Sequence, residues 1–303
     1  MQCNLDNMSS WHADEREWWD KYGEYMTFQW QLTPKLHNHL REGLENDYKE
    51  YLFKPKGKLL DIGCGSGWLS LSFAERGMSV IGIDVSQEQI NAANEIKKRK
   101  CKTNLQFECA DFIDWYNLKY LSYFDSVFVS AFMHHLPKAE LEQIIAKIAS
   151  VLKPGGKVFM YEPLSSTKKR RLTIKLFDYL INNLQQILLL KVPNWFNLFS
   201  ERHLSELARG YTMASPHERP VNIKEVEEIC DDSFIILKVD GWHIYSLGFS
   251  MQITSLKQKA RRFYEPISYI LYRVDKFIIQ RIGWEAFSTP NRFILCSVKM
   301  IRK

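Results

Sequence analysis

Several patterns that would place a protein in a secreted, membrane-spanning or zinc-binding class are missing from this sequence. The N-terminal segment lacks a basic start followed by an apolar stretch, and no apolar run reaches the roughly eighteen residues that span a bilayer. The six cysteines are scattered, with no CxxC pair and no histidines at zinc-ligand spacing. We therefore expect reduced thiols, no bound metal and a cytoplasmic protein.

A strong excess of one charge is also missing. The 41 lysine and arginine residues exceed the 35 acidic residues by a net charge of +6, which is too mild to indicate a partner. Internal repeats, low-complexity tracts and nucleic-acid recognition modules are absent from the sequence too. Because 46% of the residues are hydrophobic and 25% are charged, the composition favours a folded globular chain. We expect no nucleic-acid partner.

From residue 58 onward, short apolar segments alternate with segments of helical periodicity. Such alternation predicts a doubly wound, mainly parallel α/β sheet of seven strands with right-handed crossovers. The expected strands lie at 58–62, 79–84, 105–109, 124–130, 156–162, 234–239 and 293–300, and the helices between them at about 68–76, 87–99 and 138–152.

Three helical segments are expected in addition to this core. We expect an N-terminal helical cap at 1–50, the α/β core at 51–163, a helical insertion or lid at 164–221, and the rest of the core at 222–303, with a second insertion at about 250–285. The tryptophans and tyrosines of the cap are interpreted as core packing rather than as a substrate cage.

A glycine-rich loop follows the first expected strand. The strand ends at Asp61, and glycines at 63, 65 and 67 allow the backbone to turn tightly and to approach a ligand. The loop falls at the carboxyl end of a strand, where open α/β sheets bind their ligands. A dinucleotide fingerprint would require glycine at the position of Trp68, so the spacing does not fit NAD. A tight turn without a ligand is the simpler alternative.

This loop resembles the D-x-G-x-G-x-G cofactor loop of class I S-adenosylmethionine-dependent methyltransferases. Further segments are similar to that family in the same order, at 81–86, 109–112, 124–137 and 152–156. The resemblance implies a Rossmann-like methyltransferase fold of the small-molecule type. It also implies S-adenosyl-L-methionine as cofactor and S-adenosyl-L-homocysteine as product.

The same resemblance assigns cofactor contacts to the glycine loop and to the end of the second strand. Asp84, with Val85 beside it, matches the acidic position that binds both ribose hydroxyls, and one carboxylate can accept two hydrogen bonds from a diol. Asp84 could instead cap the next helix, although Ser86 is the better cap. The loop residues carried over are Asp61, Gly63, Cys64, Gly65 and Gly67.

Four further positions complete the expected cofactor site. Asp111 matches the residue that meets the adenine amino group, and Phe112 matches the apolar side chain that packs on the ring. Asp111 could equally be an ordinary loop residue. Ser130 ends the fourth strand, where the backbone of the family holds the cofactor's amino group. Tyr22 lies in a segment that resembles the helix closing over the methionine end.

Two histidines directly after the fourth strand are the candidate catalytic residues. Methyl transfer from a sulfonium is an in-line displacement, so a base is needed only for some acceptors. An imidazole titrates in the right range to take a hydroxyl proton, and we favour His135 over His134. The alternative is that neither transfers a proton and one only lines the pocket.

The segment at 172–190 predicts an amphipathic helix, preceded by the basic run at 168–171. A lid over the acceptor or a homodimer contact is favoured, and peripheral membrane contact is the second interpretation. His217, Glu218 and Arg219 lie between two prolines and predict a surface turn.

We expect methyl transfer to an oxygen or nitrogen of a small-molecule biosynthetic acceptor. The alternatives are a lipid or lipid-linked acceptor at a membrane surface, and a non-catalytic S-adenosylmethionine-binding protein. Nucleic-acid methylation is disfavoured, because residues 130–133 lack the proline-aromatic motif of amino-methylating nucleic-acid enzymes.

Overall fold

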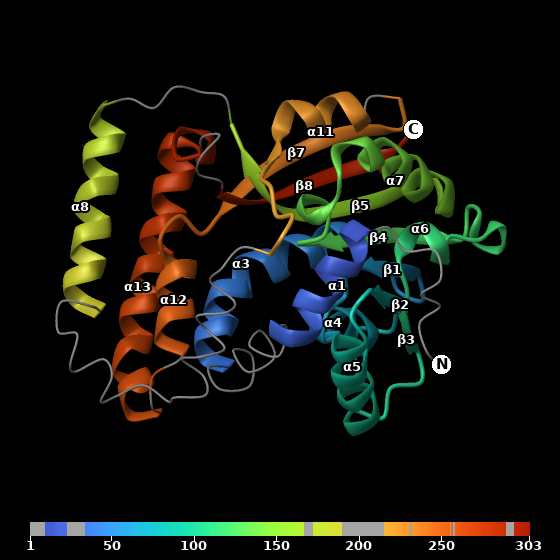
Figure 1. Cartoon of the computed structure of the whole chain (residues 1–303), viewed down its shortest axis with the longest axis horizontal. Coiled ribbons are helices and arrows are strands. Elements are labelled where there is room, and N and C mark those ends of the chain that lie inside the picture. Colours follow the sequence, from blue (N-terminus) through green and yellow to red (C-terminus); the bar gives the residue numbers. More distant parts are fainter. Residues whose placement is uncertain are drawn as a thin grey trace.

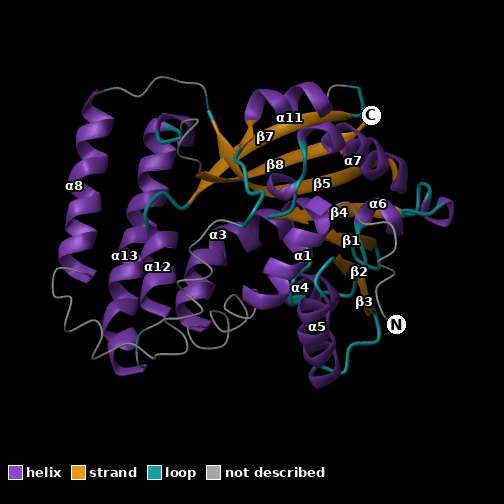
Figure 2. Ribbon diagram, in the orientation of Figure 1, coloured by secondary structure: helices purple, strands orange, loops and turns teal. Residues whose placement is uncertain are grey.

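The protein is described by a computed structural model covering residues 10–22, 34–166, 172–189, 215–230, 232–254, 256, 258–288 and 294–303. One sheet lies between helices on both of its faces, and further helices extend from one end (Figures 1 and 2). The bounds of the strands are β1 Lys58–Ile62, β2 Ser79–Asp84, β3 Leu105–Cys109, β4 Phe124–Ser130, β5 Leu152–Ser165, β6 Val221–Asn222, β7 Phe234–Trp242 and β8 Ile294–Arg302.

The strand order is β3-β2-β1-β4-β5-β8-β7, and the first five strands of this order run parallel. β8 is antiparallel to both of its neighbours. The expected doubly wound, mainly parallel sheet is therefore confirmed. An eighth strand, β6, pairs with the end of β5 and was not expected, because two residues are too short to give a periodic signal.

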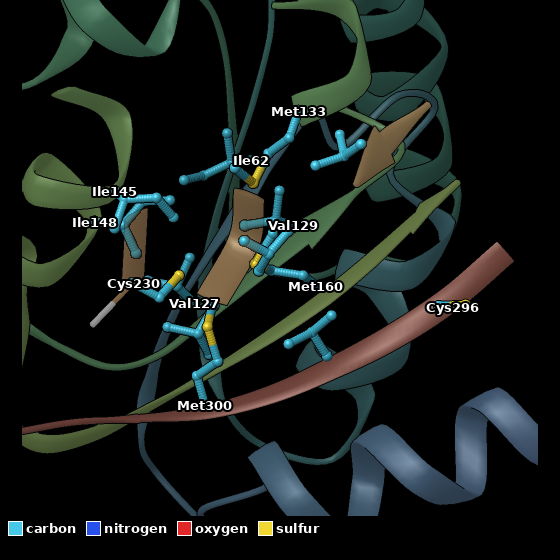
Figure 3. Close-up of a cluster of buried hydrophobic side chains, with 14 of the residues drawn as sticks. Ile62, Val127, Val129, Met133, Ile145, Ile148, Met160, Cys230, Cys296 and Met300 are labelled. Atoms are coloured by element: carbon cyan, nitrogen blue, oxygen red, sulfur yellow. The ribbon is translucent and has the colours of Figure 1, made fainter. Parts of the chain in front are cut away.

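Alternation along the strands sends side chains into two separate cores. Ile62, Val127 and Val129 face the helix α7 (Lys138–Val151), where they meet Ile145 and Ile148 (Figure 3). The opposite face packs against α3 (Pro34–Leu52), α4 (Trp68–Glu75) and α5 (Gln87–Arg99). Both faces being buried explains why these strands read as continuous apolar runs.

Helix boundaries follow local chemistry. Ser86 caps α5 by accepting a hydrogen bond from the Gln89 backbone at 3.2 Å, and three basic residues occupy the last turn. Asp111 likewise caps the short helix α6. The remaining helices are α1 Ser10–Tyr22, α6 Phe112–Trp115, η1 Leu118–Tyr120, η2 Met133–His135, α8 Leu172–Leu189, α11 Ile223–Cys230, α12 Ser246–Thr254, α13 Gln258–Ile282 and η3 Trp284–Ala286.

The expected insertion after the fifth predicted strand contains α8, and the one after the sixth predicted strand contains α12 and α13. These three helices form the end of the molecule opposite β1 to β3 (Figure 1). Buried Asp275 of α13 accepts backbone hydrogen bonds at the start of α12, from Ile244 at 2.9 Å, Tyr245 at 2.9 Å and Ser246 at 2.8 Å. The carboxylate thus joins the two helices and satisfies donors that a helix start leaves unpaired.

α8 buries Ile174, while Leu172, Leu176 and Leu180 of its expected apolar face are 81%, 60% and 56% exposed. None of the described helices is long and apolar enough to cross a membrane. The basic run at 168–171 lies outside the described residues.

Candidate active site

The glycine loop lies at the carboxyl ends of β1 and β2. Its three glycines have positive φ angles, +70° at Gly63, +51° at Gly65 and +76° at Gly67. A Cβ on Gly67 would lie 2.3 Å from the Phe107 ring, so a side chain is excluded there by space as well as by conformation. The backbone N–H of Gly63 donates to the Ile83 carbonyl at 3.0 Å, which ties the loop to β2.

Asp61 lies beneath this loop and is 1% exposed. Its Oδ2 accepts a hydrogen bond from the Ser70 hydroxyl, whereas Oδ1 has no partner among the described residues. Burial raises the pKa of this carboxyl to about 7. Cys64 is buried beside it, and burial raises the pKa of its thiol. A buried oxygen without a donor marks a place that can receive one.

Asp84 ends β2 and orients the loop. Its Oδ2 accepts from the Gly65 backbone at 2.9 Å, and its Oδ1 accepts from the Ser86 backbone at 2.9 Å. Ser86, not Asp84, caps the following helix. Each carboxylate oxygen retains a second lone pair, so the group can still accept hydrogen bonds from a diol. Burial raises the pKa of Asp84, against the effect of the two backbone donors.

The other predicted contacts fall around the same strand ends. Asp111 follows β3, and its Oδ1 accepts from the Ile113 backbone at 2.7 Å. Phe112 is 2% exposed and packs in the core under the sheet, while Val85 is half-buried. Ser130 ends β4, and its carbonyl would lie 3.3 Å from a Cβ on the first loop glycine.

α1 lies against these carboxylates; the resemblance indicated a closing helix here only through Tyr22, and the contacts of His12 and Asp20 were not expected. His12 Nδ1 is 2.6 Å from Asp111 Oδ2, and His12 Nε2 is 2.9 Å from Glu140 Oε2. The hydrogen bond with Asp111 raises the pKa of His12 to about 9, although burial opposes it. Asp20 Oδ1 accepts from the Ser86 hydroxyl at 2.6 Å. α1 is thus fastened to the ends of both β2 and β3.

His134 is held inside the post-strand turn. Its Nδ1 is 2.8 Å from Glu162 Oε2, and Glu162 Oε1 accepts from the backbones of Phe132 at 2.9 Å and Met133 at 3.0 Å. Its Nε2 lies 4.0 Å from Glu218. Burial lowers the pKa of His134 and raises that of Glu162. The histidine and the carboxyl together fix the turn after β4.

His135 is 9% exposed and differently placed. Its Nδ1 lies 3.0 Å from Glu15 Oε2 and 2.9 Å from Ser215 Oγ. Its Nε2 is buried and has no partner within the described residues. The edge of the Trp19 ring meets the imidazole with centroids 5.5 Å apart. Burial, the first cause, lowers the pKa of His135, while Glu15 raises it.

The turn predicted at 217–219 is present, with the Glu218 backbone donating to the Ser215 carbonyl at 3.2 Å, but its residues are half-buried against α1 instead of standing free on the surface. The His217 ring stacks on Trp11 with centroids 3.9 Å apart, and the Arg219 backbone donates to the His134 carbonyl at 3.0 Å. Pairing with α1 and with the turn after β4 draws the segment inward, which its two prolines do not reveal.

Tyr22 and Cys109 differ from the other predicted residues. Tyr22 ends α1, and its side chain lies outside the described residues. Cys109 is disulfide-bonded, so the expectation of six reduced thiols is wrong at this position, while Cys64, Cys101, Cys230 and Cys296 are free. In the described parts of the chain, no group of three or more His, Cys, Asp or Glu side chains could hold a metal.

His12, Glu15 and Trp19 of α1 were not predicted as site residues. His12, Glu15 and Trp19 recur three and four residues apart, so they share one helix face. That spacing of a histidine, an acid and an aromatic residue could have indicated an inward-facing side. Glu162 also escaped notice, because an acidic residue at the end of a strand has many structural uses.

Comparison with known proteins finds a similarity that covers the glycine loop and the strands around it. A family profile for a methyltransferase domain matches residues 59–156. The ubiquinone biosynthesis O-methyltransferase of Idiomarina loihiensis is 30% identical over 160 residues, which are 52% of this chain and 61% of that protein. The chain thus spans less than two thirds of this relative's length.

Solved structures share the fold over more of the chain. Geranyl diphosphate C-methyltransferase from Streptomyces coelicolor A3(2) matches 97% of this chain and 99% of its own, with a TM-score of 0.59 and 12% identity. The cyclopropane synthase MmaA2 from Mycobacterium tuberculosis matches 86% of this chain and 83% of its own, with a TM-score of 0.54 and 16% identity. At these identities the likeness concerns the fold alone.

Proposed function

We propose that this chain, which belongs to the class I S-adenosylmethionine-dependent methyltransferases, transfers a methyl group to an oxygen or nitrogen of a small-molecule acceptor. The observation that carries the proposal is the buried Nε2 of His135, which has no hydrogen-bond partner among the described residues and belongs to an imidazole near enough to influence Asp84 electrostatically. The loop and histidine come from neighbouring strands, β1 and β4, whose carboxyl ends share one edge of the sheet.

The residues present fit S-adenosylmethionine. The glycine loop leaves room for close approach, and Asp61 has a buried oxygen to which no described residue donates. Asp84 and Asp111 offer acceptors for ribose hydroxyls and for the adenine amino group. When bound, the cofactor supplies an activated methyl group on a positively charged sulfur, and the surrounding carboxylates suit that charge.

His135 would act as the general base when the acceptor is a hydroxyl. Nδ1 faces the Glu15 carboxylate, so the N–H belongs there and the lone pair of Nε2 is available. Because burial holds its pKa below 6.5, the imidazole is neutral at pH 7 and can take the hydroxyl proton. His134 would position the turn, since Glu162 occupies its Nδ1. The relatives' name, O-methyltransferase, supports oxygen as the methylated atom.

The test is release of S-adenosylhomocysteine from a panel of phenols, polyprenylated phenols and amines. We expect the protein to bind S-adenosylmethionine in calorimetry and to release product with hydroxyl acceptors. Absence of binding heat would contradict the proposal. Binding without turnover of any acceptor would favour the non-catalytic alternative.

A second candidate is methylation of a lipid or lipid-linked acceptor at a membrane surface. α13 exposes large apolar side chains, Phe263 at 69%, Ile270 at 60% and Phe277 at 59%. The same helix exposes four basic residues, Arg262, Arg273, Lys276 and Arg281. The acidic residues of α13 are buried or half-buried. An apolar and basic surface suits anionic headgroups.

Sedimentation with vesicles containing phosphatidylglycerol tests this candidate. We expect the wild type to sediment at low salt, and replacement of both Phe263 and Phe277 by serine to weaken binding at least about tenfold, since each buried aromatic contributes roughly 1.5–3 kcal/mol. The matched control is Leu118→Ser, which changes a residue 72% exposed on η1. Equal sedimentation of all three proteins, or of none, contradicts membrane binding by α13. Cytoplasmic location, a homodimer and the lid role of α8 stay predictions.

A further inference from the structure

The N-terminal helix brings a carboxylate to the histidine that the proposed function uses. Glu15 Oε2 is 3.0 Å from His135 Nδ1 as an ion-pair neighbour, while the hydrogen bond at Nδ1 is with Ser215 Oγ at 2.9 Å, and the Glu15 side chain is 6% exposed. We propose that Glu15 is a positioning residue for His135, holding the imidazole so that Nε2 faces the acceptor. The inference rests on the proposed function, because it concerns the base of the same reaction.

Glu15 determines which ring nitrogen carries the proton. A carboxylate only accepts hydrogen bonds, whereas the nearby Ser215 hydroxyl can donate or accept. Facing Glu15, Nδ1 keeps its hydrogen, and Nε2 presents a lone pair. Without this carboxylate, Ser215 could donate to Nδ1, and the proton would then move to Nε2, where it blocks the base.

Glu15 is itself held in place. Its Oε1 accepts from the His217 backbone at 3.0 Å, and the neighbouring Trp11 indole donates to the His135 carbonyl at 2.7 Å. His12 fastens the same helix to Asp111 and Glu140. These contacts therefore hold the Glu15 carboxylate beside the imidazole.

The reaction places a positive charge on His135, next to the Glu15 carboxylate. As the acceptor oxygen bonds to the methyl carbon and the carbon–sulfur bond breaks, the hydroxyl proton passes to Nε2. Neutral S-adenosylhomocysteine leaves, and the imidazolium later returns its proton to solvent. Glu15 raises the pKa of His135, so it favours the charged form. The other titratable or charged groups that face or influence His135 are His134, Glu162, Glu218 and Asp84.

The test compares Glu15→Gln, Glu15→Asp and the control Glu17→Gln, an exposed acid on the same helix. With a hydroxyl acceptor, we expect Glu15→Gln to lower kcat about 10²-fold, the loss typical of a misplaced reacting group. The acid limb of the pH–kcat profile should move to lower pH. Glu15→Asp should restore the position of that limb, and Glu17→Gln should match the wild type.

The double variant Glu15→Gln/His135→Gln should be no slower than His135→Gln alone, because both changes disable one base. An unchanged pH profile in Glu15→Gln overturns the inference. Loss of S-adenosylmethionine binding and thermal stability in both Glu15 variants also overturns it, since the carboxylate would then only dock the helix. Absence of product from the wild type would instead be a failure of the proposed function.

Discussion

Replacing His135 by glutamine should lower the rate of methyl transfer to a hydroxyl acceptor by about 10²–10⁴-fold, the usual contribution of a general base. Glutamine lacks a titratable nitrogen but fills similar space. Binding of S-adenosylmethionine should be retained, because His135 contacts α1 and the 215–219 segment rather than the glycine loop. Product release in single turnover, beside calorimetry of the cofactor, measures the two effects separately.

His217→Gln is the matched control, since His217 lies on the same side of α1 but pairs with the exposed Asp14. We expect it to stay within about threefold of the wild type, because the substitution keeps the His217 backbone donor to Glu15, and a pair with an exposed carboxylate contributes little. A wild-type rate in His135→Gln would show that no base is needed and would favour an amine acceptor. In the wild type, the acid limb of the rate profile should lie at lower pH than an ordinary histidine would give, because burial lowers the pKa of His135.

Replacing Asp84 by alanine should abolish measurable binding of S-adenosylmethionine, raising Kd by about 10²-fold or more. The reason is the loss of two hydrogen bonds to a charged acceptor, each contributing roughly 1.5–3 kcal/mol. The loop also loses the acceptor that holds the backbones of Gly65 and Ser86. Calorimetry at constant pH measures the change.

Two companion variants separate recognition from folding. Asp114→Ala removes an exposed carboxylate from α6 and should bind the cofactor like the wild type. Asp84→Asn keeps the shape of the side chain and should bind with intermediate affinity, because a neutral amide accepts more weakly. If Asp84→Ala binds normally, its carboxylate serves only the backbone of the loop. Melting curves without cofactor show whether either Asp84 variant is unfolded.

Local signals predicted the core of the fold because both faces of its strands are buried. The segments at 79–84, 105–109 and 124–130 agree with β2, β3 and β4 to the residue, since turn residues bound each apolar run. β5 begins at Leu152, four residues earlier than expected. The Pro154–Gly156 segment lies inside the strand, where the pairing with β4 shifts register, and does not precede the strand as a turn. Such irregularities depend on the neighbouring strand and leave no periodic trace.

The site was predictable only where the chain itself brings residues together. The glycine loop, Asp84 and Asp111 follow three successive strands, so parallel topology alone gathers them at one edge. Glu15 and Ser215 contact His135 only in the folded chain. Glu15 lies more than a hundred residues before His135 in the sequence, and Ser215 lies 80 residues after it. No spacing rule connects such positions, which is why the oriented histidine emerged only from the structure.

His12, placed between Asp111 and Glu140, also makes folding a proton-consuming reaction. Its pKa rises from 6.5 to about 9 on folding, so between these pH values the folded chain takes up about one proton from the buffer. This contribution to stability is complete below pH 6.5 and disappears as the pH rises through 9. The heat of folding near pH 8 therefore depends on the ionisation enthalpy of the buffer.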